Sequence, residues 1–162
     1  MNEVIHNLSA SLGQVLKRHQ LSLALVESCT GGGLAEAITA VPGSSAWFDR
    51  GFVTYSNAAK MDMLGVQAAT LNRHGAVSEA TAVEMVAGAL SHSLADLAIA
   101  VTGIAGPDGG SPEKPVGTVF IALQRRGHPA RCLHQHFHGD RQGIRHQVIN
   151  CCLHQALRML SE

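Results

Sequence analysis

The sequence has 162 residues, of which 46% are hydrophobic and 15% are charged, and its formal net charge at pH 7 is +0. A chain of this length and apolar content can bury one hydrophobic core, so we expect a single domain over residues 1–162. The lack of a basic excess argues against nucleic acid as a partner, because binding to its phosphate backbone depends on positive charge.

No segment approaches the ~20 apolar residues needed to span a bilayer, and the opening residues lack a compact hydrophobic run with a cleavage site. We therefore expect no membrane partner and a cytoplasmic location. The cysteines include an adjacent pair but no Cys-x-x-Cys spacing, which favours reduced thiols over a disulfide framework or a zinc site. They are Cys29, Cys132, Cys151 and Cys152.

The first part of the chain alternates helical and strand patterns. Ile5, Leu8, Leu12 and Val15 recur at three- and four-residue spacing, which predicts an amphipathic helix that ends near His19. The apolar run over 21–26 predicts a short buried strand. The next elements are predicted as a helix over 34–41, a strand over 51–56 and a short helix over 57–64.

The second part continues the alternation. Ser78 has the position of a cap for a long helix, whose predicted inward stripe is formed by Ala82, Val83, Val86, Ala87 and Leu90. Strands are predicted over 95–101, 118–123 and 131–138, and a closing helix over 140–160. Alternating helices and strands predict a layered α/β domain, and the near-direct succession of the last two strands predicts a hairpin and a mixed sheet.

Three polar clusters border the predicted strands: ESCTGGG at 27–33, GSSAWFDRGFVTYSNAAK at 43–60 and TGIAGPDGG at 102–110. In open α/β sheets ligands bind outside the carboxyl ends of strands. We therefore expect the three clusters to form the walls of one pocket.

In the first cluster, Ser28 or Thr30 has the side chain to cap the following helix, and Gly31 and Gly32 allow close approach of the backbone to a ligand. Free N–H groups at a helix start favour an anion such as a phosphate. We therefore expect all four residues to contact substrate. The cluster lacks the Gly-Lys-Ser/Thr ending of a nucleotide P-loop, so a tight turn with a helix cap is the alternative interpretation.

The second cluster contains Ser44, Ser45, Tyr55 and Lys60, a set suited to nucleophilic acyl chemistry without histidine. A lysine acts as a base only when its amine is neutral, which requires burial or a nearby positive charge. The alternative is a solvated surface lysine and a pair of turn-forming serines after Pro-Gly.

In the third cluster, Thr102 and the backbone around Gly103 and Gly106 are expected to contact the substrate or to stabilise an oxyanion. A surface turn is the alternative, although a Gly- and Pro-rich loop of this length in a small domain is usually functional.

Two further patterns carry possible chemistry. His134, His136 and His138 alternate along one predicted strand, but no acidic or cysteine ligand stands at a metal-binding spacing beside them, so we expect no metal site. Arg141 and Arg145 lie four residues apart at the start of the last helix, from where they could reach an anion together. A solvated helix face is the alternative.

The segments ESCTGGGLA, PGSSAWFDRGFVTYSNAAK, GAVSEATAVEM and AVTGIAGPDGGSPEKPVGTVFIAL, followed by GDR, occur in this order over nearly the whole chain. Together they closely resemble the carboxyl-terminal domain of the CinA family, also known as nicotinamide-nucleotide amidase. The resemblance implies a three-layer α/β/α sandwich with a mixed, mostly parallel sheet. It also implies hydrolysis of the carboxamide of nicotinamide mononucleotide in pyridine nucleotide salvage, without a cofactor or metal.

The resemblance also implies roles for individual residues. Ser45 would be the nucleophile, Lys60 its general base and Tyr55 a neighbour that positions or relays the proton. Thr102 would contact the substrate or the oxyanion, and Arg141 would bind the phosphate. Spacing leaves the nucleophile open among Ser45, Ser44 and Ser28.

Alternative functions follow from the same residues. One is a non-catalytic nucleotide-binding module, and another is a metal-dependent hydrolase that uses the histidine-rich strand. A third is an interacting partner in the competence or DNA-damage response suggested by the family name. The small-molecule nucleotide is the expected partner, and a homo-oligomer is expected by family analogy. Many relatives carry an additional amino-terminal domain, whose activity is not expected here.

Overall fold

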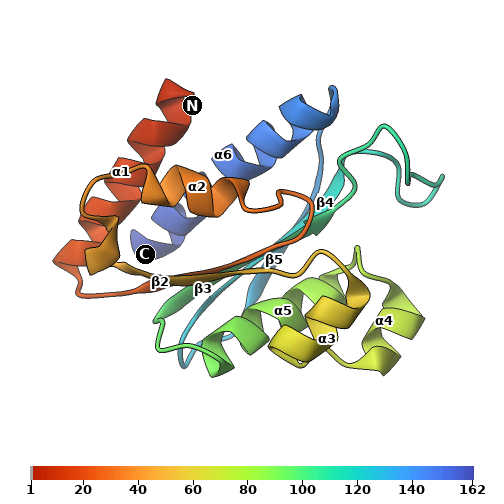
Figure 1. The fold of residues 1–162 in the computed structure, drawn as a ribbon, viewed down its shortest axis with the longest axis horizontal. Coiled ribbons are helices and arrows are strands. Elements are labelled where there is room, and N and C mark those ends of the chain that lie inside the picture. Colours follow the sequence, from red (N-terminus) through yellow and green to blue (C-terminus); the bar gives the residue numbers. More distant parts are fainter. Residues whose placement is uncertain (1) are drawn as a thin grey trace.

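The computed structural model describes residues 2–162 and contains one five-stranded sheet in the order β2-β1-β3-β4-β5 (Figure 1). The strands are β1 (Leu23–Glu27), β2 (Phe48–Val53), β3 (Leu97–Gly103), β4 (Thr118–Arg125) and β5 (Arg131–His136). The helices are α1 (Glu3–Arg18), α2 (Gly33–Thr39), α3 (Asn57–Leu64), α4 (Ala68–His74), α5 (Glu79–Ser91) and α6 (Arg141–Leu160). A short 3-10 helix, η1 (Ser44–Ala46), precedes β2.

Helices cover both faces of the sheet. One core contains Leu12 of α1, Leu34 of α2 and Val148 of α6, whereas the other contains Leu64 and Met85 from α3 and α5. Figure 1 shows α1, α2 and α6 on one side of the sheet and α3, α4 and α5 on the other. The predicted three-layer α/β/α sandwich is confirmed.

The sheet is mixed, as predicted. β1 pairs in parallel with β2 and β3, whereas β3 with β4 and β4 with β5 are antiparallel. All five residues of β1 are buried, because helices pack on both of its faces. Since two of the four pairings are parallel, the sheet is evenly mixed rather than mostly parallel.

The strand order creates a switch point at β1. The chain continues from β1 to β2 on one side, and β3 later pairs with β1 on its other side. In the parallel register Glu27 lies beside both Val53 and Val101, so the segments that leave the carboxyl ends of β1, β2 and β3 begin close together. Doubly wound sheets bind ligands outside these carboxyl ends.

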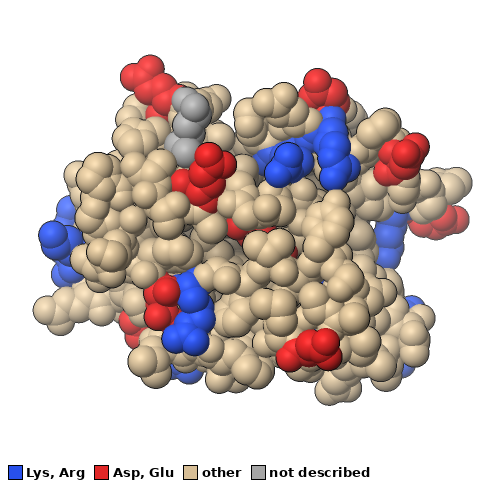
Figure 2. Space-filling model, viewed as in Figure 1, with Lys and Arg blue, Asp and Glu red and all other residues tan. Residues whose placement is uncertain are grey.

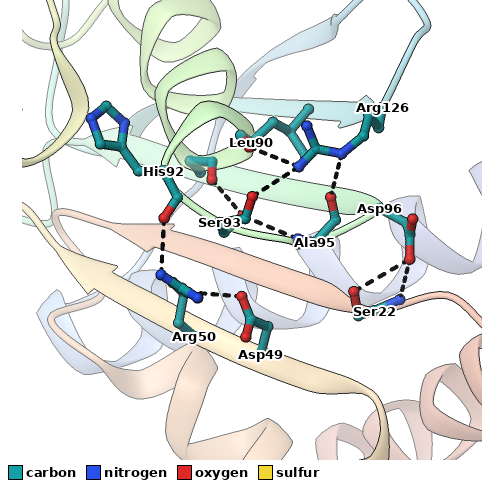
Figure 3. A network of polar contacts seen from close by, with 10 residues as sticks. Ser22, Asp49, Arg50, Leu90, His92, Ser93, Ala95, Asp96 and Arg126 are labelled. Atoms are coloured by element: carbon teal, nitrogen blue, oxygen red, sulfur yellow. Dashed lines mark hydrogen bonds and ion pairs between the residues drawn. The ribbon is translucent and has the colours of Figure 1, made fainter.

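At the opposite end of these strands, hydrogen bonds connect the neighbouring segments (Figure 3). The backbone N–H and hydroxyl of Ser22 donate to the Asp96 carboxylate at 2.9 Å and 3.3 Å. Arg126 and Arg50 donate to carbonyls at and beyond the end of α5, where positive charge compensates for the unpaired carbonyls and the helix dipole. The accepting residues are Leu90, Ser93 and Ala95 for Arg126 and His92 for Arg50.

The predicted elements agree with the structure to within two residues at each end, except in two places. The predicted strand over 51–56 begins and ends three residues earlier, because β2 is a half-exposed edge strand that contains Gly51 and has no continuous apolar run. Helix α4 was not predicted, since its seven residues bury Leu71 alone and carry no apolar stripe. Within residues 2–162 no helix has both the length and the apolar character for crossing a bilayer.

Helix α3 packs closely on α5 at Gly88. A Cβ atom at Gly88 would overlap the carbonyl oxygen of Leu64, the last residue of α3. We expect Gly88→Ala to lower the free energy of unfolding by about 1–3 kcal/mol, because added volume in a packed interface forces the backbone apart. Denaturant unfolding measures this change. Ala87→Ser serves as a control, because Ala87 is exposed in the structure and does not face inward as predicted. An equally stable Gly88→Ala protein would show that the two helices separate at no cost.

Candidate active site

A buried lysine contacts a serine near the carboxyl ends of β1 and β2. The side chain of Lys60 is 1% exposed, and its Nζ donates hydrogen bonds to Thr54 O at 2.7 Å and to Ser28 Oγ at 3.2 Å. Ser28 directly follows β1, and Lys60 lies on α3. The N-cap residue of α3 is Ser56, whose side chain accepts a hydrogen bond from the Ala59 N–H. Parallel pairing of β1 with β2 thus brings together two residues that are 32 positions apart.

Burial lowers the pKa of Lys60 below the ordinary value of 10.5, because the charged amine loses its water, although nearby Cys29 opposes part of this shift. The neutral amine, which can accept a proton, is thereby favoured. Burial also raises the pKa of the Cys29 thiol, to about 11. The serine hydroxyl is the better candidate nucleophile, because Ser28 Oγ lies within hydrogen-bond distance of Lys60 Nζ, at 3.2 Å.

The Glu27 carboxylate holds the turn that carries Ser28. Glu27 is 1% exposed and accepts hydrogen bonds from the Thr30 hydroxyl at 2.6 Å and from the backbone N–H groups of Leu34 and Ala35 at 2.8 Å and 2.9 Å. The expected side-chain cap by Ser28 or Thr30 is therefore wrong. The N-cap residue is Gly32, and a buried carboxylate from the preceding strand satisfies the start of α2.

This arrangement changes the expected roles of the first cluster. Thr30 is completely buried and bonded to Glu27, so its hydroxyl is not presented to a ligand. Gly31 and Gly32 adopt φ values of 57° and 102°, which glycine accepts without strain, and they shape the turn without lining the cavity described next. The expected anion site at the start of α2 is already occupied by a carboxylate.

Ser28 and Lys60 line a cavity of about 290 Å³. Thr102, Gly103 and Gly106 line it as well, as the third cluster predicts. The Thr102 hydroxyl donates to Ala76 O at 2.8 Å, so this side chain ties β3 to the segment before α5. The first and third clusters and the end of the second therefore meet at one site.

Tyr55 and Arg141 lie at the rim of this cavity. The Tyr55 side chain is 61% exposed, and its hydroxyl accepts a hydrogen bond from an Arg141 Nη atom at 3.1 Å. The other Nη atom of Arg141 donates to Gly106 O at 2.8 Å. Arg141 thus connects the segment after β2 with the loop after β3.

The structure does not bring Ser45 or Ser44 to Lys60. Both residues lie in η1, at the amino end of β2, whereas Lys60 follows the carboxyl end. Since strands rise by ~3.3 Å per residue, the length of β2 places these ends roughly 20 Å apart. Ser45 is exposed outside the cavity, which argues against the predicted pairing of Ser45 with Lys60.

The histidine-rich strand makes other contacts. His134 stacks on Phe120 with ring centroids 4.4 Å apart, and His136 Nε2 lies 3.0 Å from Val116 O. His138 lies beyond the end of β5. Over residues 2–162, no group of three or more His, Cys, Asp or Glu side chains is placed to hold a metal ion.

Comparison with known proteins identifies the family. The profile of the CinA C-terminal domain matches residues 5–162. The chain belongs to the CinA C-terminal domain family.

Similar proteins carry the name of an activity. A "Nicotinamide-nucleotide amidohydrolase PncC" of Enterobacter agglomerans is 51% identical over 154 residues, which cover 95% of this chain and 94% of the relative. A protein of the same name from Escherichia coli strain K12 is 53% identical over 141 residues, covering 87% and 86%. The crystal structure of competence/damage inducible protein CihA from Agrobacterium tumefaciens has a TM-score of 0.96 and 44% identity, covering 100% of this chain and 98% of that one.

In this CinA C-terminal domain, sequence reasoning missed the part played by Glu27 and Thr54. Glu27 ends a buried strand, and a carboxylate at that position could have suggested a partner at the start of α2. Thr54 acts through its backbone carbonyl, which no residue type reveals.

The lowered pKa of Lys60 predicts a pH-dependent cost of burial. An unfolded lysine stays protonated up to about 10.5, whereas Lys60 loses its proton at lower pH in the folded domain. Unfolding therefore takes up a proton in this interval, and the free energy of unfolding rises with pH. At lower pH the buried charge destabilises the wild type, so Lys60→Met should have the higher free energy of unfolding. This difference should shrink as pH rises towards 10.5, because the wild type then loses the charge.

Denaturant unfolding at several pH values tests this expectation. Lys17→Met, at an exposed position in the last turn of α1, is the control and should retain the pH dependence of the wild type. A Lys60→Met protein with the same pH slope as wild type would mean that Lys60 titrates as an exposed lysine.

Proposed function

We propose that the chain is an amidohydrolase that converts nicotinamide mononucleotide to nicotinic acid mononucleotide and ammonia, a step of pyridine nucleotide salvage. The observation that carries the proposal is the buried Lys60 amine beside the Ser28 hydroxyl in a cavity. The names of the relatives, which share about half of their residues with this chain, support the substrate.

Ser28 is the nucleophile in this proposal, in place of the expected Ser45. The neutral Lys60 amine keeps an N–H for Thr54 O and directs its lone pair to the Ser28 hydroxyl. It takes the Ser28 proton while Ser28 Oγ attacks the carboxamide carbon. The cationic pyridinium ring of the substrate would disfavour the charged lysine further.

Backbone N–H groups would stabilise the oxyanion formed by this attack. The N–H of Cys29, the residue after the proposed nucleophile, and the N–H of Ala105 donate to no backbone acceptor within residues 2–162, and both residues line the cavity. Donors of this kind often contribute a factor of about 100–1,000 each to the rate.

Collapse of the tetrahedral intermediate breaks the carbon–nitrogen bond. The Lys60 ammonium returns its proton to the departing nitrogen, which leaves as ammonia, and the acyl group stays on Ser28. Lys60 then takes a proton from water as that water attacks the ester, and the Ser28 hydroxyl is restored. This scheme requires no cofactor and no metal.

The rim of the cavity would hold the rest of the substrate. Arg141 supplies a positive charge for the phosphate, as the resemblance implies, and Tyr55 presents an aromatic ring beside it. Thr102 shapes the cavity wall through its bond to Ala76. A cytoplasmic location and a homo-oligomeric state stay predictions.

Ammonia release from nicotinamide mononucleotide, measured in the presence of excess chelator, tests the proposal. Lys60→Ala should lower kcat by about 100- to 10,000-fold, the usual contribution of a general base. Ser28→Ala should lose at least as much because the attacking atom is removed, whereas Ser45→Ala should retain activity. Circular dichroism of each variant checks that it is folded.

Two outcomes would count against this assignment. Loss of activity in Ser45→Ala with retention in Ser28→Ala would restore the nucleophile expected from the sequence. A folded wild-type protein that binds the nucleotide without releasing ammonia would favour a non-catalytic binding module.

A further inference from the structure

The acidic side chain of Asp108 lines the cavity that contains Ser28 and Lys60. Asp108 lies in the loop between β3 and β4, close after Gly106. Arg141 lines the same cavity, so an anionic and a cationic side chain border one space. Figure 2 shows Asp and Glu atoms over this loop, and Lys and Arg atoms over the amino-terminal part of α6.

The Asp108 carboxylate makes no contact that builds the fold. An aspartate in a glycine-rich turn often accepts a hydrogen bond from a backbone N–H two residues on, and so stabilises the turn. Asp108 is exposed, and within residues 2–162 it accepts no such bond and forms no ion pair. The hydrogen bonds of Arg141 and Lys60 go to other groups. The negative charge of Asp108 is therefore available to a ligand.

The loop that carries Asp108 is anchored on both sides of this residue. Before it, Gly106 O accepts a hydrogen bond from Arg141 at 2.8 Å. After it, the Nζ atom of Lys114 donates to His74 O, at the end of α4, at 3.0 Å. Because these contacts exist without a ligand, little of the loop has to be ordered when a ligand binds, which lowers the entropic cost of binding.

We propose that Asp108 is a specificity-determining residue, whose carboxylate selects substrates with a cationic ring. The inference rests on the proposed function and deepens it. In nicotinamide mononucleotide a pyridinium ring joins the carboxamide to the ribose phosphate. With the carboxamide at Ser28 and the phosphate at Arg141, this ring lies in the cavity that Asp108 borders. The carboxylate then attracts the charge of the ring, an interaction that a neutral ring does not make.

Selection by ring charge completes what the other groups recognise. The pair of Ser28 and Lys60 acts on an amide, and Arg141 attracts a phosphate. A reduced nicotinamide nucleotide has the same amide and the same phosphate, but its ring is neutral, so these groups do not distinguish it from the oxidised form. Of the residues between 2 and 162 that line the cavity, Asp108 alone has a carboxylate. It is therefore the side chain that can favour the charged ring over the neutral one.

Binding of two probes that lack an amide tests the inference without any chemical step. One is pyridine mononucleotide, which keeps the cationic ring, and the other is its carbon isostere, in which a neutral phenyl ring replaces the pyridinium. In calorimetry at low salt the wild type should bind the cationic probe about two- to fivefold more tightly, as expected for an exposed charge pair. Asp108→Asn should remove this preference and Asp108→Glu should retain part of it, while added salt should reduce the preference of the wild type.

Glu113→Gln is the matched control, because Glu113 is an exposed carboxylate of the same loop that does not line the cavity. This variant should bind both probes like the wild type. The inference would be overturned by a wild type that does not prefer the cationic probe, or by the same preference in Asp108→Asn. Equal weakening of both probes by Asp108→Asn would also overturn it, since Asp108 would then act on the loop and not on the ring charge.

These measurements do not depend on ammonia release. An inactive wild type with a preference that depends on Asp108 would contradict the proposed amidase reaction alone. An active enzyme whose preference does not depend on Asp108 would contradict the role of Asp108 alone.

Discussion

The Glu27 carboxylate, buried where β1 ends, takes the place of water for the first N–H groups of α2, and the geometry of the site follows from this contact. A buried carboxylate needs several donors to offset its loss of hydration. Thr30, Leu34 and Ala35 supply them, so the chain between Glu27 and α2 is fixed at both ends. Ser28 lies in this fixed segment, and its hydroxyl faces Lys60.

The buried Lys60 amine differs from the Glu27 carboxylate, because its partners do not offset the loss of hydration of its charged form. A charged amine with a serine and a backbone carbonyl as its partners is poorly compensated, so the folded domain favours the neutral form. That choice sacrifices stability for reactivity, a pattern common in active sites. The helix that carries Lys60 is accordingly supported by a close contact, in which Gly88 lets α5 approach Leu64.

The sequence predicts most of the fold because its buried strands and long helices carry strong apolar patterns. Helix 57–64 and the Ser78 cap agree with the structure residue by residue. The edge strand β2 and helix α4 were harder to locate because they bury few side chains, so that the apolar pattern carries little information there. Resemblance identified the family and predicted a role for Lys60, but the choice of the proposed nucleophile depends on which strand ends lie side by side. Ser45 is closer to Lys60 along the chain, whereas parallel pairing brings Ser28 to it in space.

Because Glu27 fills the start of α2, phosphate recognition in the proposed function would fall to the Arg141 side chain rather than to backbone N–H groups. A backbone cradle persists through most amino-acid replacements, since every residue but proline supplies the same N–H. A side chain that binds a ligand, in contrast, is lost or changed by a single amino-acid substitution. In the proposed function the fold therefore separates two kinds of evolutionary change: substitutions on α6 would alter which anionic substrates are accepted, while the proposed reacting pair between β1 and α3 would stay intact.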